Sequence, residues 1–263
     1  MDSDPHTRPE PKRRKTALST LPLHIASLHP LTSATAPLRP LRTGYDALDI
    51  ALHGGLPRGG LAEIYGPPGS GKTTLSLSLL ASVVASGGKA LHIDCDGSFH
   101  AKRFLELLSR FECEKGNASA RLQVARCTSW EALVSGLAHT LPGLMREGGV
   151  QLVVIDSLTF MFRLAEGAAV SKRLEAFAMR MHEAAAQVEA SVVLVNHGKK
   201  SPEGGPVVAA MGEAWQHVCA TRLCVTRDER GQGVVEIIKS PLAKRTRIPF
   251  TITLEGMEHP YPD

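Results

Sequence analysis

The sequence predicts an α/β fold built around a mostly parallel β-sheet, and two observations favour it. Short apolar runs typical of buried strands alternate along the chain with longer segments of helical periodicity. One junction between such a strand and a helix carries a glycine-rich loop of the kind that binds phosphate groups. The alternation predicts helices on both faces of the sheet. Two apolar runs that flank a turn at 228–231 add an antiparallel C-terminal extension.

Composition divides the chain into two parts. It has 263 residues, 43% of them hydrophobic, which is enough for one α/β domain with a full core. Residues 1–42 are rich in Pro, Ser and Thr and hold seven Lys or Arg against three Asp or Glu, whereas residues 43–263 hold 23 of each sign. We therefore expect a disordered lead-in at 1–42 and a folded core at 43–263. Because the core has no net charge, its average charge does not predict nucleic-acid binding.

Other features of the whole sequence bear on the cellular compartment of the protein. The five cysteines show no C-x-x-C spacing, which predicts reduced thiols and neither a disulfide framework nor a metal site. The sequence shows neither an apolar run of membrane-spanning length nor a secretory signal, so no membrane partner is expected. The basic run Pro11-Lys12-Arg13-Arg14-Lys15 has two interpretations. It is either a nuclear import signal, which would place the protein in the nucleus, or a charged run that keeps the tail solvated.

The most specific motif is a complete G-x-x-x-x-G-K-[ST] loop between an apolar run at 61–65 and a helical run that follows it. The loop and its first helical residues are Gly66, Pro67, Pro68, Gly69, Ser70, Gly71, Lys72, Thr73 and Thr74. Its glycines let backbone N–H groups turn around phosphates at the positive end of the helix. We expect Lys72 to reach the β and γ phosphates of ATP and the Thr73 hydroxyl to bind Mg²⁺.

Polar residues follow three other predicted strands. The apolar runs at 90–94, 151–155 and 190–195 end near Asp96, Asp156 and His197 respectively, and a further strand is expected at 121–126. Ligands of open α/β sheets bind outside the carboxyl ends of the strands. We therefore expect these side chains near the phosphate loop, with Asp156 acting on Mg²⁺ through its water shell.

The ordered motifs around the loop resemble the core of the RecA/RadA-type recombinases. The lead-in Thr43-Gly44, Leu48-Asp49 and Gly54–Gly59, followed by Glu63-Ile64, carries the resemblance, which extends from about Leu41 to Met257. It implies a RecA-like P-loop ATPase core with ATP and Mg²⁺ as cofactors. We also expect the helical N-terminal domain of the eukaryotic and archaeal recombinases to be lacking. That profile is similar to a eukaryotic recombinase paralogue, a recombination mediator.

The resemblance assigns catalytic roles to two residues. Asp96 matches the acidic residue that activates the attacking water, but the recombinases usually carry the longer Glu, so hydrolysis should be slow. Alternatively, Asp96 caps a helix expected at 99–111. His197 replaces the Gln of an Asn-Gln pair that senses the γ-phosphate, and it retains the ability to donate a hydrogen bond. The alternative is a histidine satisfied at a strand end.

The resemblance also suggests contact residues outside the nucleotide site. Expected loops at 160–170 and 198–206 match the DNA-facing loops of the family, and they carry Arg163, Lys199 and Lys200. These cations would neutralise phosphates, or they are simply solvated. Lys239 and Lys244 lie in the segment that caps the neighbour's ATP in recombinase filaments. The segment Leu23-His24-Ile25-Ala26 stands where recombinases carry a Phe-x-x-Ala docking motif, but it lacks the aromatic anchor.

Together these features imply a nuclear ATP-binding protein of homologous recombination and double-strand-break repair. The expected role is a mediator that helps a recombinase filament assemble on single-stranded DNA, with weak DNA-dependent ATPase and ATP-dependent damage-sensor activity. Its expected partners are another recombinase paralogue or the filament itself, in a hetero-oligomer, together with single-stranded DNA. A self-sufficient strand-exchange ATPase, a nucleotide-binding scaffold without DNA contact and a KaiC-like signalling ATPase remain open as alternatives.

Overall fold

The computed structural model describes residues 38–164, 170–200, 205–211 and 214–260. The chain divides into two units, residues 1–37 and 38–263, and only the second contains described residues. The basic run Pro11–Lys15 and the segment Leu23–Ala26 therefore lie outside the described residues. The second unit begins before the expected boundary at 42/43, since Leu41 is buried and its backbone pairs with that of Leu56.

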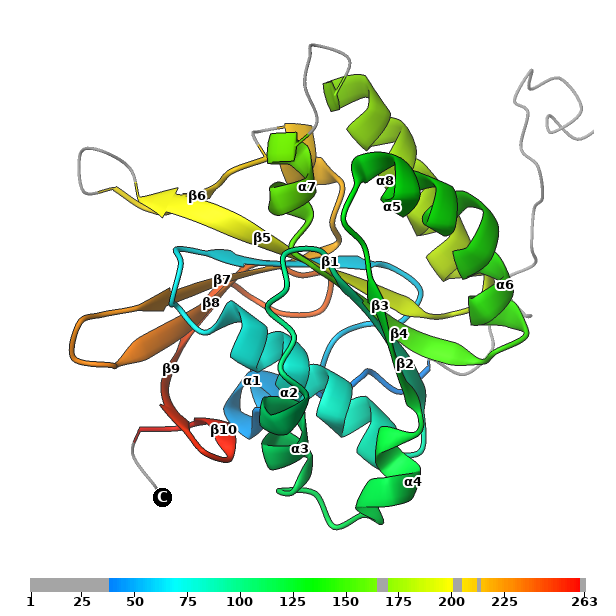
Figure 1. Ribbon diagram of the computed structural model, residues 1–263. Coiled ribbons are helices and arrows are strands. Elements are labelled where there is room, and N and C mark those ends of the chain that lie inside the picture. Colours follow the sequence, from blue (N-terminus) through cyan, green and yellow to red (C-terminus); the bar gives the residue numbers. More distant parts are fainter. Residues whose placement is uncertain (1–37, 165–169, 201–204, 212–213, 261–263) are drawn as a thin grey trace, which may run out of the picture. The chain divides into compact units, whose positions relative to one another are not determined.

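The centre of this unit is one twisted sheet with strand order β10-β9-β8-β7-β1-β5-β4-β2-β3 (Figure 1). Pairings from β7 to β3 are parallel, whereas β8, β9 and β10 continue the sheet in antiparallel fashion, and β6 pairs with the end of β5. The strands are β1 (Leu61–Gly66), β2 (Lys89–Asp94), β3 (Leu122–Arg126), β4 (Val150–Asp156), β5 (Ser191–Lys200), β6 (Val207–Ala209), β7 (Thr221–Arg227), β8 (Gly233–Lys239), β9 (Thr246–Thr253) and β10 (Gly256–Glu258). The predicted α/β fold with an antiparallel extension is confirmed.

Helices cover both faces of the sheet, with α2, α3 and α4 on one side and α5, α6 and α8 on the other (Figure 1). A π-helical turn at Gly136–Thr140 joins α5 to α6, and a short 3₁₀ turn spans Ala214–His217. The helices are α1 (Asp46–Ala51), α2 (Lys72–Ala85), α3 (Ala101–Leu108), α4 (Lys115–Ser119), α5 (Trp130–Ser135), α6 (Leu141–Arg146), α7 (Leu158–Leu164) and α8 (Val170–Gln187).

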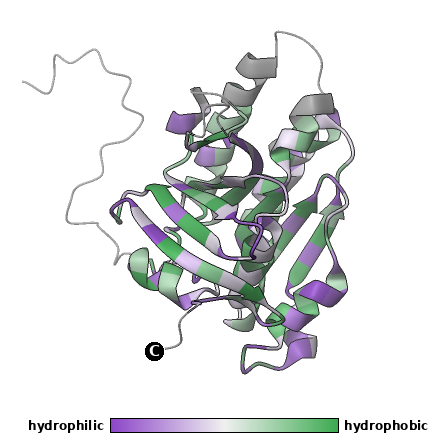
Figure 2. Cartoon of the chain, turned by 90° about the vertical axis from the view of Figure 1, so that its left-hand side faces the viewer, coloured by the Kyte–Doolittle hydropathy of each residue, from purple (hydrophilic) through white to green (hydrophobic). Residues whose placement is uncertain are grey.

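Two hydrophobic clusters fill the space between helices and sheet. Alternate residues of the central strands point to opposite faces, so Leu152 and Val154 of β4 join the cluster around α2, while Val153 and Ile155 join the one around α8. The antiparallel strand β8 instead alternates buried with half-buried residues, and this part of the sheet carries alternating colours in Figure 2. The parallel strands therefore form the fully covered centre of the sheet.

Three expectations about loops and helices are wrong in detail. Residues 160–164, expected in a loop, belong to α7, whose apolar residues Leu158 and Met161 are fully buried. Residues 198–200, also expected in a loop, continue β5 and pair with β6, because the strand extends past the sheet as a hairpin arm. The helix expected at 99–111 is the shorter α3, which begins at Ala101.

One buried histidine lies inside the core next to the strand end that carries Asp96. The His92 ring is fully buried, and its centre lies 5.1 Å from that of the Phe99 ring. Among the described residues, neither ring nitrogen has a hydrogen-bond partner. Burial lowers its pKa to about 4, against the opposing effect of Asp94 and Asp96. The folded state therefore favours the neutral imidazole.

This burial predicts acid sensitivity. A histidine with a depressed folded pKa stabilises the fold above its unfolded pKa, and that stability is lost as the pH falls toward the folded value. Between pH 7 and 5, we expect His92 to remove about 2 kcal/mol from the free energy of unfolding. Urea titrations of wild type and His92→Leu measure this loss, and the variant should show a shallower pH dependence.

The exposed His139 provides the control, since His139→Gln should leave the pH dependence unchanged. If His92→Leu and wild type lose stability in parallel over this range, the buried neutral histidine is not the cause.

Candidate nucleotide site

The phosphate-binding loop joins β1 to α2 at the carboxyl edge of the parallel strands. A Cβ on Gly66 would lie 1.9 Å from the Val225 carbonyl oxygen, so β1 and β7 approach too closely for any side chain there. Gly69 and Gly71 adopt positive φ angles of 74° and 102°, and Gly71 is the N-cap of α2. The glycines are thus required by the backbone, which wraps the start of the helix.

Two polar side chains of this loop, Lys72 and Ser70, can bind a ligand. Lys72 is largely buried, and its Nζ donates to the Pro67 carbonyl oxygen at 2.7 Å. Burial lowers the pKa of Lys72, partly offset by the nearby Asp156 and Asp96. The Ser70 hydroxyl is buried and has no hydrogen-bond partner within the described structure. A phosphate group fits this donor set, because it would accept from the ammonium, the hydroxyl and the helix N-terminus.

The expected metal ligands contact each other directly. The Thr73 hydroxyl donates to Oδ2 of Asp156 at 3.1 Å. Burial, reinforced by Asp96, raises the pKa of Asp156 to about 7, although Thr73 and Lys72 act in the opposite direction. A hydroxyl and a carboxylate are oxygen ligands of the kind that Mg²⁺ prefers, and a bound cation would favour the ionised carboxylate. The two residues therefore fit a magnesium site.

The strand register explains how these residues meet. Ile64, Val195, Asp156, Asp94 and Arg126 are successive Cα partners on β1, β5, β4, β2 and β3, and so form one row across five strands. Side chains in such a row point to the same face of the sheet. Here that face carries α2 and the phosphate loop. The row thus brings two carboxylates and a guanidinium to the floor of the site.

Asp96 lies in the turn between β2 and α3, where its side chain is exposed. Its Oδ1 accepts from the Ser98 N–H at 3.1 Å, and its charge acts on both Lys72 and Asp156. The capping alternative is wrong, since His100 is the N-cap of α3 and the turn holds Asp96 away from the helix start. Its role as a catalytic base stays a prediction.

His197 is half-buried on β5 and is the Cα partner of Gly66 of the phosphate loop in the strand register. Its backbone N–H donates to the Thr159 hydroxyl at 3.0 Å, and that hydroxyl donates to Oδ1 of the buried Asn196, also at 3.0 Å. The start of α7 therefore fixes the point where β5 leaves the sheet. This position suits a sensor of the γ-phosphate, and that role stays a prediction.

A buried polar network supports the same strand end. Asn196 Nδ2 donates to Glu63 Oε1 at 2.7 Å, and Arg222 Nε donates to Glu63 Oε2 at 2.7 Å. All three residues are buried, and the Arg222 guanidinium also lies 5.0 Å from the Tyr65 ring centre. The network ties β5, β1 and β7 together beneath the phosphate loop, so Asn196 has no rotational freedom in the folded state.

The remaining candidate residues lie outside this cluster. Arg163 belongs to α7, and Lys199 and Lys200 belong to the arm of β5, where Lys199 is exposed. Lys239 Nζ donates to the Gln216 carbonyl oxygen at 3.2 Å, and the exposed Lys244 lies between β8 and β9. Among the residues whose side chains are described, Lys199, Lys239 and Lys244 form no hydrogen bond or ion pair with the phosphate loop. Their DNA and interface roles remain predictions.

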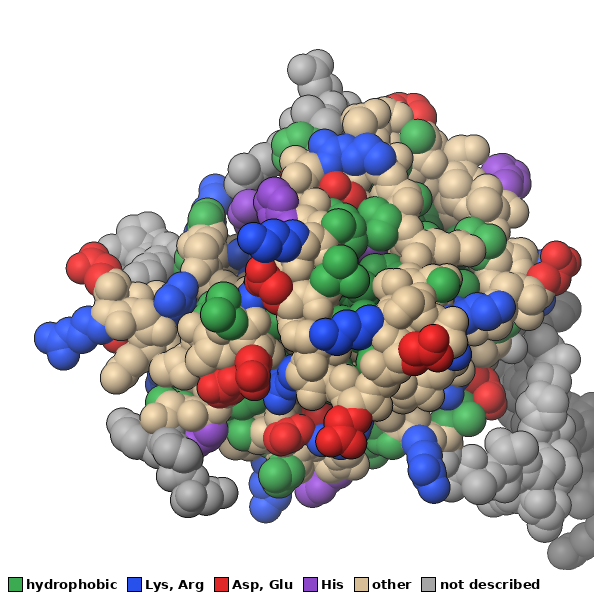
Figure 3. All heavy atoms as spheres, turned by 60° about the horizontal axis from the view of Figure 1, so that its bottom comes forward, with side chains coloured by type: hydrophobic (Ala, Val, Ile, Leu, Met, Phe, Trp, Pro, Cys, Tyr) green, Lys and Arg blue, Asp and Glu red, His purple; other side chains and the backbone are tan. Residues whose placement is uncertain are grey.

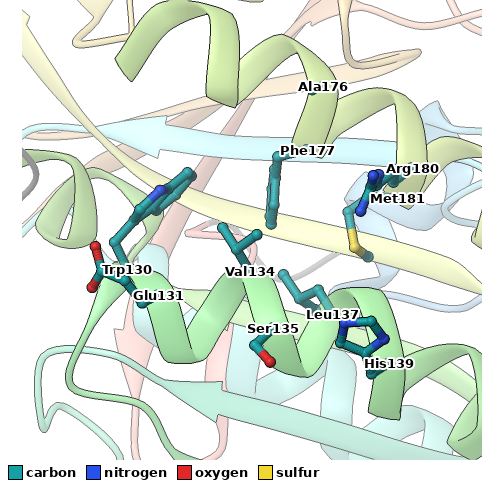
Figure 4. Close-up of a pocket in the computed structure, with 10 residues that line it drawn as sticks. All are labelled: Trp130, Glu131, Val134, Ser135, Leu137, His139, Ala176, Phe177, Arg180 and Met181. Carbon is teal, nitrogen blue, oxygen red and sulfur yellow. The ribbon is translucent and has the colours of Figure 1, made fainter. Parts of the chain in front are cut away.

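A separate hollow opens on the other face of the sheet (Figure 4). It has a volume of about 470 Å³ and lies between α8 and the segment of α5 with its π-helical turn. Trp130 and Phe177 form its apolar wall, and Glu131 and Arg180 are among its polar residues. Since these elements belong to the core cluster around α8, this hollow is distinct from the phosphate loop.

Two further searches bear on the site and its surroundings. The described residues contain no group of three or more His, Cys, Asp or Glu side chains arranged to hold a metal ion. In the part of the chain that the structure describes, no helix combines the length and apolar character needed to cross a membrane.

Sequence reasoning missed several residues of this region. Asp94 and Arg126 were seen only as strand residues, yet they form an ion pair of 2.7 Å beside Asp156. Asp94 stands three residues before Gly97, a spacing typical of Asp-initiated turns that would have drawn attention to it. The ion pair between Glu63 and Arg222 could not be recognised from a local sequence pattern, since 158 residues separate the two positions.

Comparisons with known proteins agree with this geometry. The Rad51 family model matches residues 37–260. The chain is 32% identical over 275 residues to DNA repair protein RAD51 homolog 2 of Mus musculus, an alignment that covers 86% of this chain and 77% of that protein. It is 31% identical to DNA repair protein RAD51 homolog 4 of Mus musculus, with 85% and 73% covered. DNA repair and recombination protein RadA of Metallosphaera sedula is 24% identical, with 92% and 79% covered.

The buried network generates a stability prediction. Arg222→Met leaves the Glu63 carboxylate buried without its cationic partner, so the free energy of unfolding should fall by about 3–5 kcal/mol. The double variant Glu63→Leu with Arg222→Met removes both charges and should recover part of that loss, because the buried Asn196 then lacks its acceptor. Urea denaturation followed by far-UV circular dichroism measures both effects.

The exposed pair between Arg245 and Glu236 is the matched control, and Arg245→Met should leave the unfolding midpoint nearly unchanged. A double variant as unstable as Arg222→Met alone would show that lost packing, rather than an uncompensated charge, is responsible.

Proposed function

Because the chain belongs to the Rad51 family, we propose that it is an ATP-binding protein of homologous recombination and double-strand-break repair. In this role it helps a recombinase filament assemble on single-stranded DNA. The observation that supports the proposal is the contact of Thr73 with Asp156 beside a buried Lys72, since these donors suit a phosphate group and a magnesium ion. The names of the mouse relatives support the repair setting.

ATP and Mg²⁺ are the proposed cofactors. Bound Mg²⁺ neutralises charge on the β and γ phosphates. For its part, the chain supplies the Thr73 hydroxyl and the Asp156 carboxylate on one side and the Lys72 ammonium on the other. Gly66 and Gly71 keep side chains out of the loop, so backbone N–H groups can approach the phosphates.

Hydrolysis is proposed to be slow. Asp96 is the candidate base, and its carboxylate is one methylene shorter than the usual glutamate of the recombinases. A misplacement on the order of 1 Å in a positioned group costs about 10²-fold in rate. ATP binding, more than turnover, is therefore the proposed working event.

We propose that binding acts as an assembly switch. His197 lies opposite Gly66, and the hairpin of β5 and β6 begins directly after it, so a γ-phosphate that engages His197 would bias the arm that carries Lys199. This arm is the proposed contact with single-stranded DNA. On the face that contains α3 and β10, Figure 3 shows acidic and basic side chains interspersed.

The proposed partner is another Rad51-family protein, in a hetero-oligomer. Strand β3 is the edge of the parallel side of the sheet, and Gln123 to Arg126 are exposed. An apolar hollow of about 220 Å³ lies beside it, between β2, β3 and α5 to α6. An unpaired edge with an adjoining apolar hollow suits an extended segment that adds a strand and buries a side chain. A nuclear location follows from this setting as a further proposal.

The proposal predicts that Lys72→Ala abolishes ATP binding while the fold is retained. The loss of a charge-assisted contact to phosphate should raise the dissociation constant for ATP by at least about 30-fold. Isothermal titration with Mg-ATP measures the affinity, and circular dichroism checks the fold.

The exposed Lys89 at the start of β2 is the control, and Lys89→Ala should bind ATP normally. Equal ATP affinity in Lys72→Ala and wild type would refute the nucleotide site.

The edge of β3 allows a sharp test of partner binding. The N–H of Cys127 and the carbonyl of Arg121 bond to β2, and because backbone groups alternate along a strand, those of Val124 point to the open side. Val124→Pro removes an outward donor without breaking the inner ladder, so it should abolish binding to a purified Rad51-family recombinase from the same organism and leave the fold intact.

Val124→Ala keeps the backbone donor and should retain most of the binding, as measured by light scattering and filament assembly on single-stranded DNA. Unimpaired assembly with Val124→Pro would place the partner elsewhere. Assembly on DNA without any partner would favour the self-sufficient ATPase.

A further inference from the structure

The turn between β2 and α3 is held from inside by one carboxylate. Asp94 Oδ1 accepts from the backbone N–H groups of Gly97 at 2.8 Å and Ser98 at 3.1 Å. Gly97 has a φ angle of 85°, so the turn reverses sharply at that residue. Asp96 lies within these bonds, and the same Ser98 N–H reaches its Oδ1. The direction of Asp96 therefore depends on the position of Asp94.

The second oxygen of this carboxylate is bound from the edge of the sheet. Arg126 Nη1 donates to Asp94 Oδ2 at 2.7 Å, and the two residues are Cα partners on neighbouring strands. A Cβ added to Gly97 would lie 2.7 Å and 2.8 Å from the two terminal nitrogens of Arg126. The guanidinium thus packs directly on the turn as well as bonding to the carboxylate beneath it.

The ion pair between Arg126 and Asp94 lies in a region that carries several carboxylates. Asp94 and Asp156 are Cα partners, and Asp96 lies close enough to act on the pKa of Asp156, so three carboxylates lie near one another. Burial works to raise the pKa of Asp94, but the hydrogen bonds from Arg126 and Gly97 outweigh it and lower that pKa. Arg126 therefore favours the ionised form of Asp94. An ionised carboxylate accepts stronger hydrogen bonds from the two backbone N–H groups than a protonated one.

We propose that Arg126 is a positioning residue that fixes the turn carrying Asp96 through its contact with Asp94. The effect on turnover rests on the proposed function, whereas the effect on the turn does not. Arg126 touches neither the phosphate loop nor Asp96 in the described structure, so it acts only through Asp94 and Gly97. Its side chain is half exposed on β3, so its removal should cost the fold little.

The test compares Arg126→Ala and Arg126→Lys with wild type in the full chain. Hydrogen exchange at the Gly97 and Ser98 amides, followed by NMR, should be at least about fivefold faster in Arg126→Ala, because the acceptor loses a charged partner. Arg126→Lys should restore part of the protection. The turnover rate should fall in Arg126→Ala while the Mg-ATP dissociation constant stays unchanged.

Lys89→Ala, an exposed change at the start of the neighbouring strand β2, is the control and should alter neither the exchange rates nor the turnover rate. Unchanged exchange at Gly97 and Ser98 in Arg126→Ala would overturn the assignment, whatever the turnover. Faster exchange in a protein whose wild type binds no ATP would support the positioning role and refute the proposed function instead.

Discussion

The whole site depends on the in-register pairing of five parallel strands. Because β1, β5, β4, β2 and β3 pair without a shift at their carboxyl ends, Ile64, Val195, Asp156, Asp94 and Arg126 fall in one row. A slip of one residue would turn each side chain to the opposite face of the sheet. The apolar members of the row enter the core around α2. Of the polar members, Asp156 contacts Thr73 at the phosphate loop, and Asp94 and Arg126 form an ion pair with each other. The hydrophobic pattern that sets the register therefore also places the charges.

This dependence explains why much of the fold could be predicted from the sequence. Buried parallel strands are continuous apolar runs, and the loop from Gly66 to Thr74 is a local motif, so both are visible without tertiary knowledge. Thr73 and Asp156 were expected to share a metal, and their hydrogen bond agrees with that expectation. The boundaries of α7 and β5 were not predictable, because burial of Met161 and pairing with β6 are tertiary effects.

The buried network that sequence reasoning did not foresee depends on a different property. Glu63, Arg222 and Asn196 come from three strands. They stabilise the fold because each satisfies the buried charge or hydrogen-bonding groups of another, and no local sequence spacing reveals such contacts. The prediction that Asp96 caps a helix failed for a related reason. Its short side chain bonds within its own turn at Ser98, and local side-chain bonds of this kind compete with helix capping.

The open edge of the sheet adds a last constraint. Edge strands expose unpaired backbone groups, and β3 carries on that edge the residue whose guanidinium holds the turn of Asp96. A strand added along β3 would lie beside Arg126 and exclude water from its contact with Asp94. Because ion pairs strengthen when water is excluded, such a partner would stiffen the turn without touching the nucleotide. If the proposed partner binds at β3, one ion pair would couple that binding to the turn of Asp96, and by reciprocity a ligand that orders the turn would favour the partner.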